Sequence, residues 1–299
     1  MFLSEDEVRQ RLPWERLIPA IERALADLSA GRVVQPMRVV FPVGDHGGFF
    51  GSMPAYAGAL GAKLVTFYPR NRGLPTHHAL IALFRPETGE PLAVMDGRLI
   101  TEMRTAAASA AATKALARAN VSTLGILGSG VQARSHLEAL QQARRFRDVR
   151  LYSPHGAARV AAELGVRAAA TAEEAVRGAD LVVVATTSQT PVLRGEWLSP
   201  GAHVNAVGAT RPDWRELDDE ALRRARIFVD SREAASKESG DVIAALAAGA
   251  EVVEAGEVIA GARPGRRSAD EITLFKSVGV AVEDVAAAAI VLEEASREH

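Results

Sequence analysis

Hydrophobic positions near the start of the chain follow the spacing of a helix. They recur once per helical turn until Gly31 stops the pattern, and they are Leu17, Ile18, Ile21, Leu25 and Leu28. Ser4 and Glu7 precede them in the S-x-x-E arrangement that caps a helix N-terminus. The pattern therefore predicts that the chain opens with an amphipathic helix.

Between residues 38 and 96 the pattern changes to that of strands. Short apolar runs are separated there by clusters of Gly and Pro, which are typical of turns. The predicted strands are Arg38–Phe41, Phe49–Met53, Lys63–Tyr68, His78–Phe84 and Leu92–Met95. The segment Arg85–Glu90 predicts a hairpin turn between the last two strands. We therefore predict an antiparallel sheet.

A long Ala-rich helix, from about Ile100 to Arg118, leads into a region where strands and helices alternate. The predicted strands are Thr123–Leu127, Val149–Tyr152, Leu181–Ala185, His203–Val207, Ile227–Val229 and Ile272–Lys276. The predicted helices are Val131–Arg144, Ala157–Leu164, Leu217–Arg224 and a closing helix, Val282–Ala295. Such alternation favours a parallel sheet that is covered on both faces.

Composition excludes several classes of protein. A chain of 299 residues is expected to form about two domains. Its 35 basic and 37 acidic residues leave a net charge of −2, which indicates neither a nucleic-acid partner nor a membrane partner. The absence of cysteine excludes disulfides and thiolate chemistry. Because no secretory pattern and no spanning apolar stretch is present, we expect a cytoplasmic protein.

A glycine-rich turn, G-x-G-x-x-A from Gly128 to Ala133, follows the first strand of the alternating region. Gly128 permits the tight turn, Gly130 lets a pyrophosphate approach the backbone, and Ala133 allows close packing of the helix. The next helix begins at Val131 and Gln132, so its N-terminal N–H groups and dipole face the phosphates. This arrangement predicts a dinucleotide-binding site.

The end of the second strand bears on the choice of dinucleotide. An acidic residue at that point normally binds the ribose 2′-hydroxyl of NAD. Here the sequence is Tyr152-Ser153-Pro154-His155, with Arg159 one turn further on and no acid. Because Ser153 with His155 or Arg159 could accept a 2′-phosphate, we expect NADP(H) as the cofactor, with NAD as the alternative.

Further motifs, each different from the others, are distributed along almost the whole chain. They are Pro36–Arg38, Gly51–Tyr56, Gly61–Val65, Leu99–Ala107, Asn205–Asp218, Val229–Ser231, Lys237–Asp241 and Thr273–Gly279. Together with the Gly128 turn they occur in the order seen in the ornithine cyclodeaminase/mu-crystallin family, which the sequence resembles. The resemblance implies an α/β fold. In it a Rossmann domain, residues 117–279, is inserted into a discontinuous α+β substrate-binding and dimerisation domain, residues 1–116 plus 280–299.

The resemblance also implies a chemistry. Members of the family are homodimeric oxidoreductases or cyclodeaminases that use a nicotinamide cofactor on amino acids or imines. Arg38 and Arg104 match positions that hold the substrate carboxylate, and Lys63 matches the usual proton donor. Thr76 matches a threonine near the substrate.

Three further residues are expected near the cofactor. Thr105 and Ser277 match positions near the phosphates and nicotinamide, and Thr186 follows a strand where it is placed to line the pocket. His77 lies beside Thr76, but no third ligand occurs at a useful spacing. We therefore expect no metal, and interpret His77 as a pocket or structural residue.

One departure separates the possible activities. Thr210 stands where cyclodeaminases and alanine dehydrogenases of the family carry an Asp, whereas the run Arg211–Leu217 is similar to the ketimine-reducing mu-crystallin branch. We therefore expect an NAD(P)H-dependent reductase of an α-imino acid, a cyclic ketimine such as pyrroline or piperideine carboxylate. A cyclodeaminase or alanine-type dehydrogenase using NAD, and a non-catalytic ligand-binding protein, remain alternatives.

Overall fold

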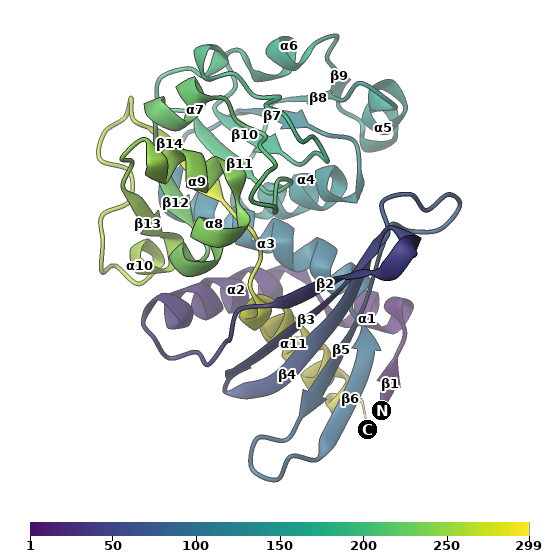
Figure 1. Cartoon of the computed structure of the whole chain (residues 1–299). Helices are drawn as coiled ribbons and strands as arrows, with labels where there is room; N and C mark the ends of the chain where they lie inside the picture. Colours follow the sequence, from purple (N-terminus) through teal and green to yellow (C-terminus); the bar gives the residue numbers. More distant parts are fainter. Residues whose placement is uncertain (299) are drawn as a thin grey trace. The chain divides into compact units, whose positions relative to one another are not determined.

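The computed structural model describes residues 1–298 and divides the chain into two compact units (Figure 1). Unit 1 holds Met1–Arg104 and the segment from Gly279 onward, and unit 2 holds Thr105–Val278. The first boundary falls inside helix α3, Arg98–Leu116, whereas the sequence placed it after residue 116. A helix that continues across a boundary shows no break in its pattern. Residue 299 of the expected 280–299 segment lies outside the described residues.

Two helices open unit 1 where the sequence predicted one. They are α1, Glu5–Arg11, and α2, Trp14–Ser29. The predicted cap of α1 is present, because the Ser4 backbone N–H and hydroxyl donate to Glu7 Oε2 at 2.8 and 2.7 Å. The break follows from Pro13, which lacks an N–H and disfavours helical geometry at Leu12. The hydrophobic pattern continues on α2, which buries Leu17, Ile21 and Leu25.

Unit 1 contains a six-stranded sheet in the order β1-β6-β5-β4-β3-β2. Its strands are β1 Phe2–Leu3, β2 Val39–Val43, β3 Gly48–Ala57, β4 Ala59–Phe67, β5 His77–Phe84 and β6 Pro91–Asp96. Strands β2 to β6 run antiparallel, as predicted, and the hairpin turn at Arg85–Glu90 is present. The parallel strand β1 was not predicted, because two residues are too short to show a period.

The last helix, α11 (Ala281–Arg297), packs on β3, β4 and β5 and against α2 (Figure 1). The sheet face that it covers carries a buried cross-strand row in the register Met53–Lys63–Ile81–Met95. Lys63 is thus the one charged residue in a row that is otherwise apolar. The sheet therefore carries a lysine into the core of unit 1.

Unit 2 contains an eight-stranded parallel sheet in the order β13-β12-β14-β11-β10-β7-β8-β9. Its strands are β7 Thr123–Leu127, β8 Asp148–Tyr152, β9 Arg167–Ala168, β10 Leu181–Val184, β11 His203–Ala206, β12 Ala225–Val229, β13 Val252–Glu254 and β14 Ile272–Lys276. The chain adds β8 and β9 on one side of β7 and then continues on the other with β10 and β11. The carboxyl ends of β7 and β10 therefore form a topological switch point, where α/β sheets bind ligands.

Helices and short single turns connect the strands of unit 2 (Figure 1). The helices are α4 Val131–Ala143, α5 Ala157–Leu164, α6 Ala172–Val176, α7 Asp219–Arg224, α8 Arg232–Glu238, α9 Gly240–Ala247 and α10 Ala255–Ile259. Strand β10 is fully buried, as a covered parallel strand requires. The predicted α/β fold class is confirmed. None of the described helices is both long and apolar enough to cross a membrane.

Candidate functional site

A buried cluster of charges lies on the covered face of the unit 1 sheet. The Lys63 side chain is only 2% exposed, and its Nζ lies 2.7 Å from Asp284 Oδ2. The other oxygen of Asp284 accepts a hydrogen bond from Arg104 Nε at 2.9 Å. Arg104 Nη1 donates to Glu283 Oε2 at 2.7 Å. Two adjacent acids at the start of α11 thus bind a strand lysine and a helix arginine.

Arg38 joins this cluster through the turn that precedes α11. Its Nη2 donates to the carbonyl oxygen of Gly279. Gly279 has a φ of +76°, and a Cβ at this position would collide with the Arg104 guanidinium. Glycine is therefore required both by the backbone conformation and by the space that Arg104 occupies. The structure brings together Arg38, Lys63 and Arg104, which the sequence singled out.

The electrostatics of the cluster make Lys63 an unusual lysine. Its pKa is lowered to about 8: burial is the largest cause, Arg104 and Arg38 act in the same direction, and Asp284 opposes them. Burial alone would raise the pKa of Asp284, but Arg104 and Lys63 outweigh it and hold that pKa below its usual value. With Lys63 protonated, three cations face two carboxylates. These five side chains therefore carry one net positive charge.

His77 begins β5 and lies four positions along this strand from Ile81, the cross-strand partner of Lys63. His77 pairs with Phe67 of β4, and Thr76 is exposed just before the strand. Burial, together with the charges of Lys63 and Arg104, lowers the pKa of His77 to about 4. His77 is therefore neutral near pH 7 and adds no charge. Within residues 1–298, no group of three or more His, Asp and Glu residues is arranged to hold a metal.

The glycine-rich turn of unit 2 has the form of a phosphate cradle. Gly128 has a φ of +127°, and a Cβ there would collide with the carbonyl oxygen of Ala185 at the end of β10. Gly130 is the N-cap of α4 and has open space where a side chain would stand. Val131 and Gln132 then begin the helix, so that their N–H groups have no partner within α4. The turn fits a dinucleotide pyrophosphate.

The end of β8 lies beside this turn. The Gly128 N–H donates to the Tyr152 carbonyl at 2.8 Å, and Ser129 Oγ donates to the His155 carbonyl at 3.0 Å. Ser153 is half-buried and His155 is exposed. Arg159 on α5 is also exposed and pairs with Glu163 at 2.7 Å. The segment from Tyr152 to His155, which carries two of these three residues, therefore contacts the glycine-rich turn.

The hydroxyl groups expected near the cofactor have partners inside unit 2. Thr186 Oγ1 donates to Glu216 Oε1 at 2.7 Å, and Ser277 Oγ donates to Asp230 Oδ2 at 2.8 Å. Both acids are buried. Thr105 is buried on α3. The hydroxyl protons of Thr186 and Ser277 are thus used within the protein, which fixes the direction of both side chains.

Sequence reasoning missed the buried acids of both units. Glu216 accepts hydrogen bonds from the backbone N–H groups of Thr186, Gly208 and Ala209 at 2.7–3.0 Å, and so joins the loops after β10 and β11. Glu283 and Asp284 could have been noticed, because they are adjacent acids in a segment that otherwise contains only Val and Ala. Acids buried on such a helix need cationic partners. Thr210 is exposed in the loop after β11.

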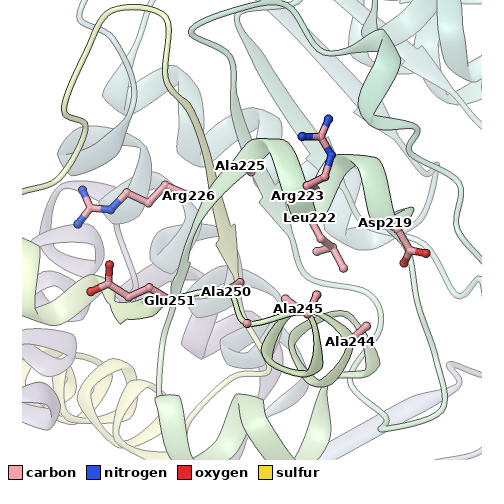
Figure 2. A pocket seen from close by; sticks show the side chains of 11 residues that line it. Asp219, Leu222, Arg223, Ala225, Arg226, Ala244, Ala245, Ala250 and Glu251 are labelled. Atoms are coloured by element: carbon pink, nitrogen blue, oxygen red, sulfur yellow. The ribbon is translucent and has the colours of Figure 1, made fainter.

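A separate hollow of about 330 Å³ lies in unit 2, at the amino ends of β12 and β13 (Figure 2). This is the opposite edge of the sheet from the glycine-rich turn, because all eight strands run parallel. Figure 2 shows the guanidinium groups of Arg223 and Arg226 pointing in different directions. Arg223 pairs with Glu220, and Arg226 lies over the Phe228 ring. The cationic groups that line this hollow therefore do not converge on a common point.

Comparisons with known proteins cover the whole chain. Residues 1–299 match the model of the ornithine cyclodeaminase/mu-crystallin family. The ketimine reductase mu-crystallin of Mus musculus is 49% identical over 306 residues, which span 98% of this chain and 96% of that protein.

Two solved structures are similar throughout. The Thermococcus litoralis Delta(1)-pyrroline-2-carboxylate reductase, in complex with NADH and L-proline, has a TM-score of 0.94 and 39% identity, covering 100% of this chain and 98% of its own. An archaeal alanine dehydrogenase dimer with bound NAD has a TM-score of 0.93 and 38% identity, covering 100% and 96%.

The charges around His77 lead to a first prediction. We expect its imidazole to titrate with a midpoint near pH 4, measured by NMR of the labelled histidine. Lys63→Met should raise this midpoint, because the variant removes a positive charge that disfavours the imidazolium. Lys237→Met, on helix α8 of unit 2, is the matched control and should leave it unchanged. A wild-type midpoint near 6.5 would contradict the assignment.

Proposed function

The chain belongs to the ornithine cyclodeaminase/mu-crystallin family, and we propose that it acts as an NAD(P)H-dependent reductase of an α-imino acid. Cyclic ketimines such as pyrroline and piperideine carboxylates are the proposed substrates. The observation that carries the proposal is the buried Lys63, held with Arg38 and Arg104 around the start of α11. Arg38, Lys63, Arg104, Glu283 and Asp284 together carry one net positive charge, which a substrate carboxylate would balance.

Each cation has a separate task in this proposal. The planar guanidinium groups of Arg38 and Arg104 hold the substrate carboxylate. Lys63 gives its proton to the imine nitrogen. When bound, the nicotinamide supplies the hydride that adds to the imine carbon, while the π electron pair moves to the nitrogen. The products would be a secondary amine, the oxidised nicotinamide and a neutral lysine, which takes up a proton from solvent.

The charge and the pKa of the cluster suit this reaction. One net positive charge matches a substrate with a single carboxylate. A lysine pKa of about 8 lies close to neutral pH, where a general acid is both protonated and able to give up its proton. A binding protein without catalysis has no need for such a lysine, which argues against the non-catalytic alternative.

A second candidate is amino-acid oxidation. It is favoured by the archaeal alanine dehydrogenase, which has the same fold at 38% identity. Against it stands Thr210, which offers no carboxylate to handle a substrate amine. We therefore rank the alanine-type dehydrogenase and the cyclodeaminase below the imine reductase.

Unit 2 is the proposed cofactor domain and unit 1 the substrate domain. Gly128, Gly130, Val131 and Gln132 would hold the pyrophosphate, while Thr105, Thr186 and Ser277 would lie toward the phosphates and nicotinamide. We propose NADP(H) as the preferred cofactor. This is supported by Ser153 and His155, which stand where an acid would select NAD. The two solved relatives hold NADH or NAD, so NAD is the alternative.

The proposed protein is a cytoplasmic homodimer. The uncovered face of the unit 1 sheet carries a cross-strand row in the register Val39–Ser52–Leu64–Leu80, and its three apolar members are 61%, 42% and 46% exposed. An exposed apolar face of this kind is typical of a protein interface. The archaeal relative is described as a dimer. The cysteine-free composition supports the location.

The central prediction concerns Lys63. Wild-type protein should consume NAD(P)H in step with pyrroline or piperideine carboxylate, and Lys63→Met should lower kcat by at least about 100-fold, because the proton donor is lost. Lys237→Met serves as the control. Proline and ammonia formed from ornithine without net cofactor turnover would instead identify a cyclodeaminase. Unchanged turnover in Lys63→Met would remove the assigned role.

Cofactor choice is tested at the end of β8. Wild-type protein should show a higher kcat/KM for NADPH than for NADH. Ser153→Asp should lower the NADPH to NADH ratio by about tenfold or more, because a carboxylate there repels a 2′-phosphate. Ser268→Asp, an exposed position before β14 at the opposite edge of the sheet, is the matched control. A wild-type preference for NADH would overturn the NADP proposal and leave the reductase proposal standing.

The interface is tested by charge insertion. Leu64→Glu should convert the dimer into a monomer in sedimentation velocity, because it places a carboxylate in the apolar row. Leu246→Glu, an exposed apolar position on α9 of unit 2, should leave the dimer intact. A wild-type protein that sediments as a monomer at micromolar concentration would refute the interface.

A further inference from the structure

Two adjacent acids begin α11, and both are completely buried. They differ in their partners. Glu283 accepts from Arg104 Nη1 at 2.7 Å and from the Val280 backbone N–H at 3.4 Å, so it also caps its own helix. Asp284 instead contacts two cations from different elements, Lys63 on β4 and Arg104 on α3.

Each carboxylate oxygen of Asp284 contacts a different cation. Oδ2 lies 2.7 Å from Lys63 Nζ, and Oδ1 accepts from Arg104 Nε at 2.9 Å. A carboxylate is rigid and planar, so an ammonium on one oxygen and a guanidinium on the other have a fixed separation and direction. A short side chain at the first turn of a packed helix has few alternative positions. The two cations are therefore oriented relative to each other through a single group.

We infer that Asp284 is a positioning residue of the proposed reaction, which fixes Lys63 Nζ relative to the Arg104 guanidinium and keeps that lysine protonated. The inference rests on the proposed function. Asp284 takes no part in proton transfer to substrate in this scheme. Its effect passes through Lys63, which meets the imine nitrogen, and through Arg104, which meets the carboxylate.

The charged groups around Lys63 determine the direction in which its pKa shifts when Asp284 is neutralised. Asp284 of α11 favours its charged form, while Arg104 of α3 and Arg38, which precedes β2, disfavour it. His77 of β5 faces the same charges and is neutral near pH 7. Removing the Asp284 charge leaves Lys63 with burial and two cations, so its pKa must fall. Because a reductase needs Lys63 protonated, the alkaline limb of kcat must then move to lower pH.

The test compares Asp284→Asn with Glu283→Gln, two neutral near-isosteres at adjacent buried positions. Asp284→Asn should move the alkaline midpoint of kcat down by about one pH unit or more. It should also lower kcat at pH 8 more than it changes KM. Glu283→Gln should raise KM for the imino acid through Arg104 and leave the midpoint in place. Asp284→Glu keeps the negative charge, so its alkaline midpoint of kcat should lie between those of Asp284→Asn and wild-type protein.

A second measurement needs no turnover. The chain has only four lysines, Lys63, Lys114, Lys237 and Lys276, so lysine labelled with ¹³C at Cε gives four resolvable NMR titrations, and Lys63→Met assigns one of them. The Lys63 midpoint should lie near 8 in wild-type protein, lower in Asp284→Asn, and unchanged in Glu283→Gln. NADP(H) binding to each variant shows that unit 2 remains folded.

The outcomes separate the two proposals. A wild-type protein that reduces no imine refutes the proposed function, whatever the lysine titration shows. An active wild-type protein whose Lys63 midpoint and pH profile are the same in Asp284→Asn refutes the positioning role alone. Equal shifts in Asp284→Asn and Glu283→Gln would also refute it, because they would indicate a general effect of buried charge.

Discussion

Burying an ammonium beside guanidinium groups is unfavourable unless anions are buried with them, and this constraint organises unit 1. Lys63 occupies a row of the sheet whose other members are apolar, so its cross-strand neighbours offer its ammonium no polar or charged partner. Glu283 and Asp284 supply the missing charge from the opposite end of the chain. The packing of α11 on the sheet is therefore an electrostatic requirement as well as a hydrophobic one.

Unit 2 uses buried acids differently. Glu216 receives three backbone N–H groups from the loops after β10 and β11, and Asp230 receives the Val278 N–H and the Ser277 hydroxyl. Here the carboxylates satisfy backbone donors at the carboxyl ends of the strands, where a ligand would otherwise meet irregular and mobile loops. The loops at this edge of the sheet are thus held in place by buried carboxylates.

Much of this architecture could be predicted from local pattern. Strands Thr123–Leu127 and Ile272–Lys276 and helix Ala157–Leu164 were predicted to the residue. A glycine directly follows the first strand and the helix and marks where each ends. Prediction was wrong at Pro13, where one proline divides a helix that otherwise keeps its apolar face. It also failed for Glu283 and Asp284, since sequence alone does not reveal that distant cations will neutralise two acids. Lys63, Arg38 and Arg104 were found only through motifs, because a basic residue on a strand is ordinarily solvated.

The position of α11 also has a consequence for the order of synthesis. On the ribosome, residues 1–104 are synthesised long before residues 279 onward. During that interval Lys63 and Arg104 are present without the two acids of α11 that pair with them. Because Glu283 and Asp284 lie close to the end of the sequence, the buried charges of unit 1 can be neutralised only when almost the whole chain has been made. The two carboxylates are thus the last members of the cluster to be synthesised, and a chain cut short before them would leave Lys63 and Arg104 without the acids that pair with them.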